Sequence, residues 1–241
     1  MDIEKLGSYC FIDKNYKYNN SDTEPELLIF DEKKWKKRFP VDIKKDVDLT
    51  KLQLTNTGLY SIALPHISEA LINLILNLCK MYKLNKNKLY ITESNGGVGG
   101  FSIRLATHFN YLNIVEINDT HIGIIKNNIK VYDLDNKKKK INIIEADYLD
   151  VMFTLNNDII ICDPPWGGVD YINKQTIKLG FNNINIICII NELLKKNSFK
   201  IFILYAPRNF NIQQFVFGVN TSKISIDKFS RFYFITIFNL N

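Results

Sequence analysis

Short apolar runs alternate with stretches of helical periodicity along most of the chain. Runs with the length and the β-branched or aromatic content of strands cover residues 88–92, 112–115, 141–145, 158–162 and 199–205. Apolar side chains recur at helical spacing in residues 65–80, 101–109, 119–132 and 184–196. Two more predicted strands, 223–226 and 232–238, would close the chain as a hairpin. We therefore predict an α/β fold with a Rossmann-like sheet of seven strands, all parallel except one.

The beginning of the chain does not follow this alternation. Residues 1–30 are polar and rich in turn-forming residues, so we predict an N-terminal segment without regular structure. Residues 31–57 predict a small helical N-terminal lobe ahead of the α/β domain, which we place at residues 58–241. A length of 241 residues and a hydrophobic content of 46% suit one α/β core with such an appendage.

The most specific chemical pattern follows the apolar run 158–162. It combines an acid, two prolines, an aromatic residue and two glycines, Asp163-Pro164-Pro165-Trp166-Gly167-Gly168. Open α/β sheets hold their ligands at the carboxyl ends of strands. The Pro164 carbonyl and the Asp163 carboxylate offer acceptors there without a competing proline N–H, and Trp166 offers a stacking face. The set suits a planar base with a reactive exocyclic amino group, and an ordinary Asp-Pro turn is the alternative.

A glycine-rich loop separates the predicted strand 88–92 from the predicted helix 101–109. Its residues are Gly96-Gly97-Val98-Gly99-Gly100. Strand, glycine loop and helix form a nucleotide-binding arrangement, in which Gly97 and Gly99 would let a ligand approach the backbone closely. The loop matches neither G-x-G-x-x-G nor a Walker motif, and a purely structural turn is the alternative.

Acidic residues around this loop indicate which ligand it favours. Glu93 would repel a pyrophosphate but attract the ammonium and sulfonium groups of S-adenosylmethionine (SAM). Glu116 ends the next strand about 20 residues after the loop, at the spacing of an acid that binds ribose hydroxyls. Asp147 and Tyr148 follow the third strand, where they would bind the adenine amino group and cover its ring. A helix cap is the alternative for Asp147. We expect SAM as the cofactor, without a metal.

These motifs together resemble the trimethylguanosine synthase family within the class I SAM-dependent methyltransferases. The resemblance extends over roughly residues 35 to 238, and residues 58–241 would form the methyltransferase domain. It rests on Gly58-Leu59-Tyr60-Ser61, Gly97-Val98-Gly99-Gly100, Lys126-Asn127-Asn128 with Val131-Tyr132, the tryptophan motif with Asp170-Tyr171, and Pro207-Arg208-Asn209. The pair Asn95-Gly96 departs from the bulkier pair of the family.

The resemblance implies methyl transfer from SAM to the exocyclic N2 of 7-methylguanosine in RNA caps, giving m2,7G or, after a second transfer, m2,2,7G. Asp163, Pro164 and Trp166 would then form the catalytic motif, with Asp163 also contacting the cofactor. Arg208 and Asn209 would bind the cap phosphates, whereas a loop arginine paired with an acid is the alternative for Arg208. Other acceptors open to this motif are adenine N6, cytosine N4 and a protein glutamine amide. A noncatalytic RNA-binding module on a methyltransferase scaffold is a further alternative.

The net charge of +6 suits a polyanion such as RNA. Cations flank Trp35 over residues 33–38, and further lysines fill residues 137–140. We predict that Trp35 binds the substrate and that its lobe contributes to cap binding, with a simple surface helix as the alternative. For residues 137–140 we favour a solvated loop.

Cysteine, histidine and hydropathy patterns narrow the class of protein. Four scattered cysteines, without C-x-x-C spacing, predict a reduced intracellular protein, nuclear or cytoplasmic, without disulfide or structural metal: Cys10, Cys79, Cys162 and Cys188. His66, His108 and His121 are isolated in sequence, so we predict structural or surface roles for them. No apolar run approaches the ~20 residues of a bilayer span. We expect a monomer, of cellular or viral origin, that acts on 7-methylguanosine-capped RNA.

Overall fold

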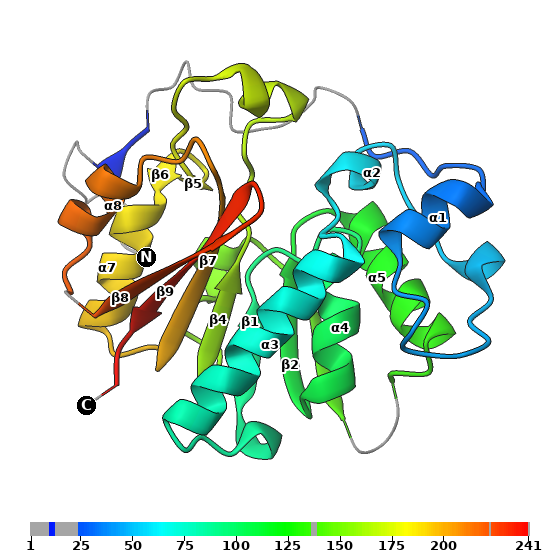
Figure 1. Cartoon of the computed structure of the whole chain (residues 1–241), viewed down its shortest axis with the longest axis horizontal. Coiled ribbons are helices and arrows are strands. Elements are labelled where there is room, and N and C mark those ends of the chain that lie inside the picture. Colours follow the sequence, from blue (N-terminus) through cyan, green and yellow to red (C-terminus); the bar gives the residue numbers. More distant parts are fainter. Residues whose placement is uncertain (1–9, 13–23, 136–138, 222, 241) are drawn as a thin grey trace. The chain divides into compact units, whose positions relative to one another are not determined.

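A computed structural model describes residues 10–12, 24–135, 139–221 and 223–240 of the chain (Figure 1). Its residues fall into two compact units. The first unit is Glu24–Tyr148, and the second unit combines Met1–Thr23 with Leu149–Asn241.

The first unit contains three parallel strands and the helices around them. The strands are β1 (Tyr90–Glu93), β2 (Tyr111–Glu116) and β3 (Lys140–Glu145), in the order β3-β2-β1. The helices, with 3-10 helices written η, are α1 (Glu32–Arg38), η3 (Leu49–Lys51), α2 (Gly58–Ser61), α3 (Pro65–Met81), η4 (Lys86–Lys88), α4 (Gly100–His108) and α5 (Asp119–Val131). Helix α6 (Tyr148–Val151) begins at Tyr148, the last residue of the first unit, and continues into the second unit.

Helix α3 shows how the sequence pattern produces these elements. Proline at its first position has a φ suited to a helix start and lacks an N–H that would go unbonded there. Its apolar residues recur every three or four positions and are buried: Ile67, Leu71, Ile72, Ile75 and Leu78. The opposite side carries exposed polar residues, so α3 packs by one face.

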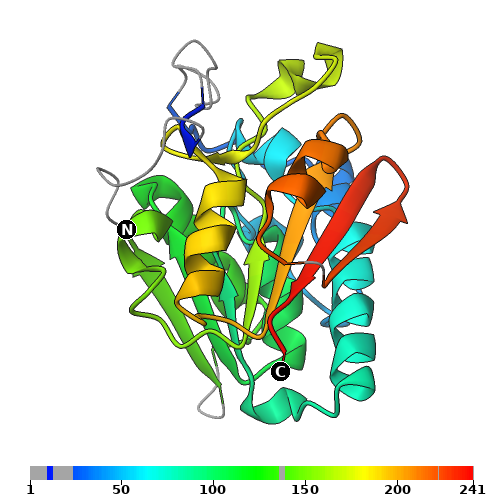
Figure 2. The same cartoon turned by 90° about the vertical axis from the view of Figure 1, so that its left-hand side faces the viewer.

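The second unit carries the Asp-Pro-Pro-Trp motif and the end of the chain. Its strands are β4 (Ile159–Cys162), β5 (Gly180–Phe181), β6 (Ile184–Asn185), β7 (Ile201–Pro207), β8 (Ile224–Phe229) and β9 (Phe232–Phe238). Its helices are η5 (Val169–Asn173), α7 (Ile186–Lys195) and α8 (Ile212–Gly218). Strand β4 pairs in parallel with β7, whereas β9 runs antiparallel to both β7 and β8. Figure 2 shows β8 and β9 as the red hairpin.

Seven strands form one sheet in the order β3-β2-β1-β4-β7-β9-β8. Every pairing of β9 is antiparallel, and the pairings β1–β2, β2–β3 and β4–β7 are parallel. This confirms the predicted Rossmann-like α/β sheet with one reversed strand. The two-residue strands β5 and β6 form a separate small sheet that the sequence pattern did not predict.

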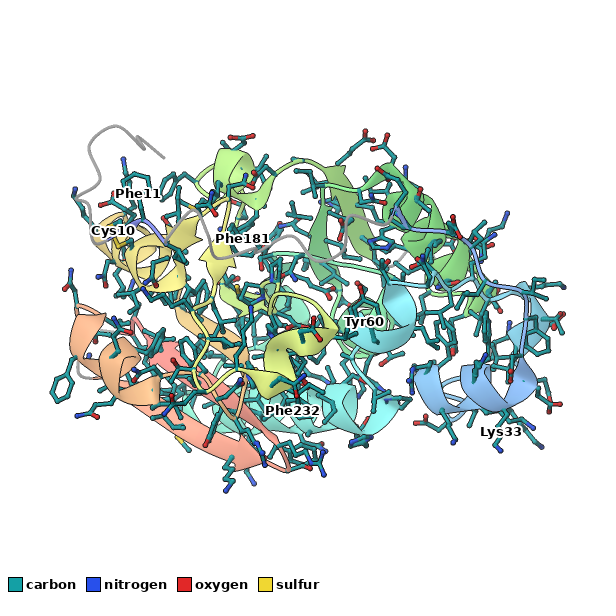
Figure 3. All side chains as sticks on the ribbon, turned by 90° about the horizontal axis from the view of Figure 1, so that it is seen from above. Cys10, Phe11, Lys33, Tyr60, Phe181 and Phe232 are labelled. Atoms are coloured by element: carbon teal, nitrogen blue, oxygen red, sulfur yellow. A yellow bond between two sulfur atoms is a disulfide. The ribbon has the colours of Figure 1, made fainter. Side chains whose placement is uncertain are left out.

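The prediction of no disulfide is wrong. Cys10 and Cys188 are bonded, with their Cα atoms 5.6 Å apart, and Figure 3 shows Cys10 beside α7. The bond is accompanied by a backbone hydrogen bond of 2.7 Å from Ile12 N to Asn183 O and by burial of Ile12. The two cysteines are 178 residues apart in sequence, so only the fold brings them together. Residues 1–9 and 13–23 lie outside the described residues, where the prediction of irregular structure stays a prediction.

Within the described residues, we find no helix whose length and apolar character would allow it to cross a bilayer.

Candidate functional site

The glycine loop of the first unit joins β1 to α4 in the predicted arrangement. Gly97 has φ +54° and Gly99 φ +95°, values that L side chains rarely adopt. A Cβ atom at Gly97 would meet nothing within 4 Å, so the backbone here has open space above it. At Gly96 and Gly100, in contrast, a Cβ would lie 2.5 Å from Ile114 Cγ2 and 2.7 Å from the Ala63 nitrogen. The outer two glycines are therefore needed for packing, and Gly97 offers a surface to a ligand.

Glu116 connects the end of β2 to this loop. Its Oε2 accepts a hydrogen bond of 2.7 Å from Gly97 N, and its Oε1 accepts from Ile117 N at 3.0 Å and from Asn118 N at 2.9 Å. Burial raises the pKa of the Glu116 carboxyl, and the three backbone N–H groups act against this shift. A carboxylate has about four acceptor positions. Oε2, with one backbone bond, can thus still accept from a ribose hydroxyl.

Glu93, predicted to attract the cationic groups of SAM, is more buried than that role requires. It ends β1, is 3% exposed, and accepts a hydrogen bond of 2.5 Å from Ser102 Oγ on α4. No lysine or arginine occurs in residues 93–100. The loop is therefore acidic, which fits a ligand with cationic groups and disfavours a pyrophosphate.

His121 lies beside Glu116 and the glycine loop, although its isolation in the sequence predicted only a structural or surface role. Its Nε2 lies 3.3 Å from the hydroxyls of Thr55 and Thr57, and its Nδ1 lies 4.0 Å from Glu116 Oε1. Burial lowers the pKa of His121, which favours a neutral ring at neutral pH. Thr55 is 66 residues away in sequence, so no local signal revealed this contact.

Asp147 and Tyr148 follow β3 at the same edge of the sheet as Glu116. A backbone hydrogen bond of 3.1 Å from Ala146 N to Glu116 O places Asp147 next to the end of β2. Asp147 is half-buried, and Tyr148 is only 2% exposed at the start of α6. Acids at the ends of three adjacent strands, with a neutral glycine surface, fit the ammonium, ribose and adenine groups of SAM. The individual contacts of Asp147 and Tyr148 stay predictions.

Asp163 of the second unit stands immediately after β4, as predicted. Part of the residue remains accessible, but dense surroundings raise the pKa of its carboxyl well above the usual value. The Trp166 indole N–H acts in the opposite direction, lowering the pKa of Asp163 without completing a hydrogen bond of regular geometry. Strand β4 holds the acid in place through its register with β7, in which Cys162 is opposite Leu204.

Trp166 lies in a cluster of aromatic rings. Its ring centroid is 4.9 Å from that of Tyr171, 5.1 Å from Tyr205 and 5.6 Å from Phe232. The residue is half-buried, and its Nε1 is fully buried and has no hydrogen-bond partner among the described residues. Gly167 and Gly168, with φ +90° and +76°, turn the chain directly after the ring. Sequence reasoning missed Tyr205 and Phe232, which come from β7 and β9.

The charge of Asp163 acts on its aromatic neighbours. Burial, and then the nearby Asp163 carboxylate, raise the pKa of both Tyr171 and Tyr205. Both phenols therefore keep their protons at neutral pH and can act as hydrogen-bond donors.

Arg208 and Asn209 follow β7 and have different roles. Arg208 is exposed and lines a cavity together with residues of the β8–β9 hairpin. Asn209 donates through Nδ2 to the carbonyls of Tyr171 at 2.7 Å and Lys174 at 2.9 Å. Both amide hydrogens of Asn209 are used to hold the segment after the tryptophan motif. Asn209 thus positions this segment, and because it also lines the cavity of Arg208, its role in binding the cap phosphates stays a prediction.

The prediction that Trp35 binds the substrate is wrong in this structure. Trp35 is 1% exposed, its Nε1 donates to Leu52 O at 2.8 Å, and Phe30 and Phe39 pack against it. The helical period explains the error, because Trp35 lies on the inner face of α1, where the C-cap residue Phe39 packs against it, while the lysines are exposed. Figure 3 shows one of them, Lys33, on this helix. Lys137 and Lys138 lie outside the described residues.

Among the residues that the structure describes, no three His, Cys, Asp or Glu side chains gather in a geometry that could hold a metal ion.

Comparison with known proteins gives one family and several relatives. A sequence model described as RNA cap guanine-N2 methyltransferase matches residues 67–235. The uncharacterized protein L320 of Acanthamoeba polyphaga mimivirus is 35% identical over 131 residues, which make up 53% of this chain and 50% of that protein. The chain thus spans about half the length of this curated relative.

Two solved structures are similar in fold at low sequence identity. The N-terminal domain of human METTL16 is 13% identical with a TM-score of 0.54, covering 81% of this chain and 75% of that chain. A putative SAM-dependent methyltransferase from Streptococcus mutans is 14% identical with a TM-score of 0.52, covering 78% and 53%. These likenesses bear on the fold alone, and they agree with the seven-stranded sheet.

Proposed function

Because this chain belongs to the RNA cap guanine-N2 methyltransferase family, we propose that it methylates the exocyclic N2 of 7-methylguanosine in capped RNA. The protein is a SAM-dependent methyltransferase with a class I fold. The proposal concerns its acceptor: a cap nucleotide rather than adenine N6, cytosine N4 or a glutamine amide.

The observation that carries the proposal is the pairing of Asp163 with a half-buried Trp166, whose ring is still partly accessible. A desolvated carboxylate beside an aromatic face suits a flat base that presents an amino group. 7-Methylguanine carries a positive charge, so stacking on an indole adds a cation–π attraction of about 0.5–2 kcal/mol over neutral guanine. The Asp163 charge would favour the same cation.

Asp163 and Pro164 would orient the attacking amine. The arylamine is a weak nucleophile because its lone pair conjugates with the ring. Acceptors at the Asp163 carboxylate and the Pro164 carbonyl hold both amine hydrogens and favour a pyramidal nitrogen as positive charge develops on it. When bound, SAM supplies an electrophilic methyl group on a sulfonium. The chain's contribution is mostly positioning and electrostatics.

Asp163 also suits the final proton transfer. The alkylated amine is acidic and must lose one proton. Burial makes the Asp163 carboxylate a stronger base than an exposed aspartate, because the pKa of its acid form is raised. The proton therefore has an acceptor beside it, and no histidine is required.

The first unit would bind the donor. Glu116 would accept from the ribose hydroxyls through Oε2, while the Gly97 backbone lets the ligand approach. Glu93 and Asp147 supply negative charge for the cationic end and an acceptor for the adenine amine. Arg208 of the second unit would bind the cap phosphates, for which a guanidinium fork is suited.

The test is mass spectrometry of three acceptors after incubation with purified protein and SAM. 7-Methyl-GTP and capped RNA should each gain about 14 Da for every methyl group transferred to N2; GTP should react several-fold more slowly, because its neutral base lacks the cation–π attraction. Equal use of GTP would contradict the stacking argument. Methylation of uncapped RNA, DNA or peptide in preference to 7-methyl-GTP would overturn the proposed acceptor. If calorimetric titration of the protein with SAM or S-adenosylhomocysteine shows no binding, the alternative of a noncatalytic RNA-binding module would be favoured.

A further inference from the structure

A cationic cavity of about 420 Å³ lies within the second unit. Four of its lining residues are cations, Lys174, Arg208, Lys228 and Arg231, and no acid lines it. Among the described residues, Arg208, Lys228 and Arg231 form no ion pair. A cavity with these properties binds anions, and its volume is in the ~300–1,000 Å³ range of small-molecule sites.

Three segments of the second unit place these cations together. A backbone hydrogen bond of 3.1 Å from Arg208 N to Arg231 O ties the end of β7 to the β8–β9 turn. Lys228 is opposite Tyr233 in the β8–β9 register, and both line the cavity. Asn209, through its bond to the Lys174 carbonyl, fixes the third segment. The arrangement is set by backbone pairing, so it is preformed.

The cavity lies close to the proposed base site in sequence and in space. Arg231 directly precedes Phe232, whose ring centroid is 5.6 Å from that of Trp166 (Figure 3 labels Phe232). Arg208 directly follows β7, which carries Tyr205 against the same indole. The two arginines thus adjoin segments whose rings pack on Trp166. Lys228 and Lys174 belong to the other side of the hairpin turn and to the end of η5.

The number of charges exceeds what a cap needs. The triphosphate bridge between two nucleosides carries one ionised oxygen on each of its three phosphates. Two arginine forks suit such clustered phosphates, whereas lysines act as point charges that follow a backbone. With the cap triphosphate held by the two arginine forks, the two lysines of the cavity are left for further phosphates.

We propose that Lys228 and Lys174 bind the first phosphodiester groups of the RNA body, beyond the cap triphosphate. The site would let the protein prefer capped RNA over a free cap nucleotide. This inference rests on the proposed function, because the cap fixes which end of the RNA enters the cavity.

The experiment compares the salt dependence of binding for three ligands: 7-methyl-GTP, the cap dinucleotide and a capped RNA of about ten nucleotides. Each phosphate contact to a single strand adds about 0.7 to the slope of log affinity against log salt. The capped RNA should show a slope steeper than the dinucleotide by about 1.4, for two lysines. Lys228→Ala should remove about 0.7 of this difference and weaken RNA binding several-fold, leaving the dinucleotide unchanged. The double variant with Lys174→Ala should remove about 1.4.

Two variants serve as controls. Lys195→Ala removes an exposed lysine of α7, which pairs with Glu192 outside the cavity, and should leave both slopes unchanged. Lys228→Arg keeps the charge and should keep the slope. Lys228 is exposed on β8, so its replacement should not unfold the protein.

Two results would overturn the inference. If Lys228→Ala weakens the dinucleotide as much as the RNA, the lysine binds the cap triphosphate itself. If it changes neither, the cavity holds no RNA phosphate. Failure of the proposed function gives a different result, in which 7-methyl-GTP is not methylated on N2. Loss of uncapped RNA binding in Lys228→Ala would then still support an RNA phosphate site.

Discussion

Each unit of the chain contains one tryptophan and at least one strand-end acid that the sequence marks as functional, and Trp35 with Glu116 has different surroundings from Trp166 with Asp163. In the first unit, Trp35 is fully buried with its N–H bonded to Leu52, and Glu116 accepts three backbone N–H groups. In the second unit, Trp166 is half-buried, its buried Nε1 forms no hydrogen bond of regular geometry with the described residues, and Asp163 has a strongly raised pKa.

The two pairs differ in which groups interact with their polar atoms. Buried polar groups in proteins are normally hydrogen-bonded, and exceptions concentrate at functional sites. The fold itself supplies hydrogen-bond partners to Trp35 and to Glu116, and Glu116 holds the glycine loop through Gly97 N. Trp166 has a buried indole N–H without a regular hydrogen bond among the described residues, and Asp163 carries the energetic cost of a desolvated carboxylate, which a cationic ligand can relieve. A tryptophan near cations is therefore not enough to indicate a binding site.

The largest expected effect is on stability. Trp35→Ala should lower the free energy of unfolding by about 3–5 kcal/mol, as for other buried aromatic side chains, measured by urea denaturation. Trp35→Phe should lose less and should bind 7-methyl-GTP with unchanged affinity. If Trp35→Phe folds but binds 7-methyl-GTP much more weakly, Trp35 would have to be assigned to the binding site after all.

Asp163→Ala should reduce the rate of methyl transfer by about 100- to 1,000-fold, the cost of removing one preorganised transition-state contact. S-adenosylhomocysteine binding, measured by calorimetry, should remain. Asp150→Ala, an exposed acid of α6 in the same unit, is the matched control and should retain full activity. A variant at Asp163 with near-normal turnover would exclude the acid from the chemistry.

Glu116→Gln should weaken SAM binding by roughly 10- to 100-fold, because hydrogen bonds to a charged group contribute about 1.5–3 kcal/mol. Affinity for 7-methyl-GTP should not change. Glu145→Gln provides the control, since Glu145 is the register partner of Glu116 on β3 and is exposed. Equal losses in both variants would point to a general charge effect rather than a specific contact.

Trp166→Ala should remove the preference for 7-methyl-GTP over GTP, a factor of about 2 to 30 from the cation–π contribution. Trp166→Phe should keep part of it. Competition binding with the two nucleotides measures the ratio directly, and an unchanged ratio in Trp166→Ala would rule out stacking on this ring.

The smallest effect is a pH-dependent change in thermal stability. Because burial raises the pKa of Asp163 above its unfolded value, the folded state holds this proton more tightly, and stability falls as the pH rises through the folded pKa. Asp163→Asn removes that cost and should raise the Tm near neutral pH by a few degrees, at roughly 2–4 °C per kcal/mol. The gain should shrink as the pH falls toward 3.8, the ordinary value. A gain that does not vary with pH would have another cause.

Much of the fold could be predicted because its signals are local. The apolar run 112–115 became β2, and the run 199–205 corresponds to β7 at Ile201–Pro207. The strand-end acids Glu116 and Asp163 were predicted from their places after such runs. Trp35 was misjudged because the charges around it were given more weight than its helical spacing to Phe39. That spacing was the available signal.

Other features had no local signal. The Cys10–Cys188 bond, the contact of His121 with Thr55, and the ring of Phe232 against Trp166 each join residues far apart in sequence. Long-range contacts of this kind depend on strand order and register, which single-sequence patterns do not fix.

The sequence by itself determined the alternation of strands and helices, the left-handed turns at Gly97 and Gly99, and the acid and indole of the tryptophan motif. These follow from side-chain periodicity, backbone freedom and chemical identity, which are properties of residues and their near neighbours. Only the tertiary structure decided which tryptophan is covered, which carboxylate is held in place by backbone N–H groups, and which cations share one cavity. Burial and pairing are properties of the packed chain, because they depend on what distant segments bring to the same place.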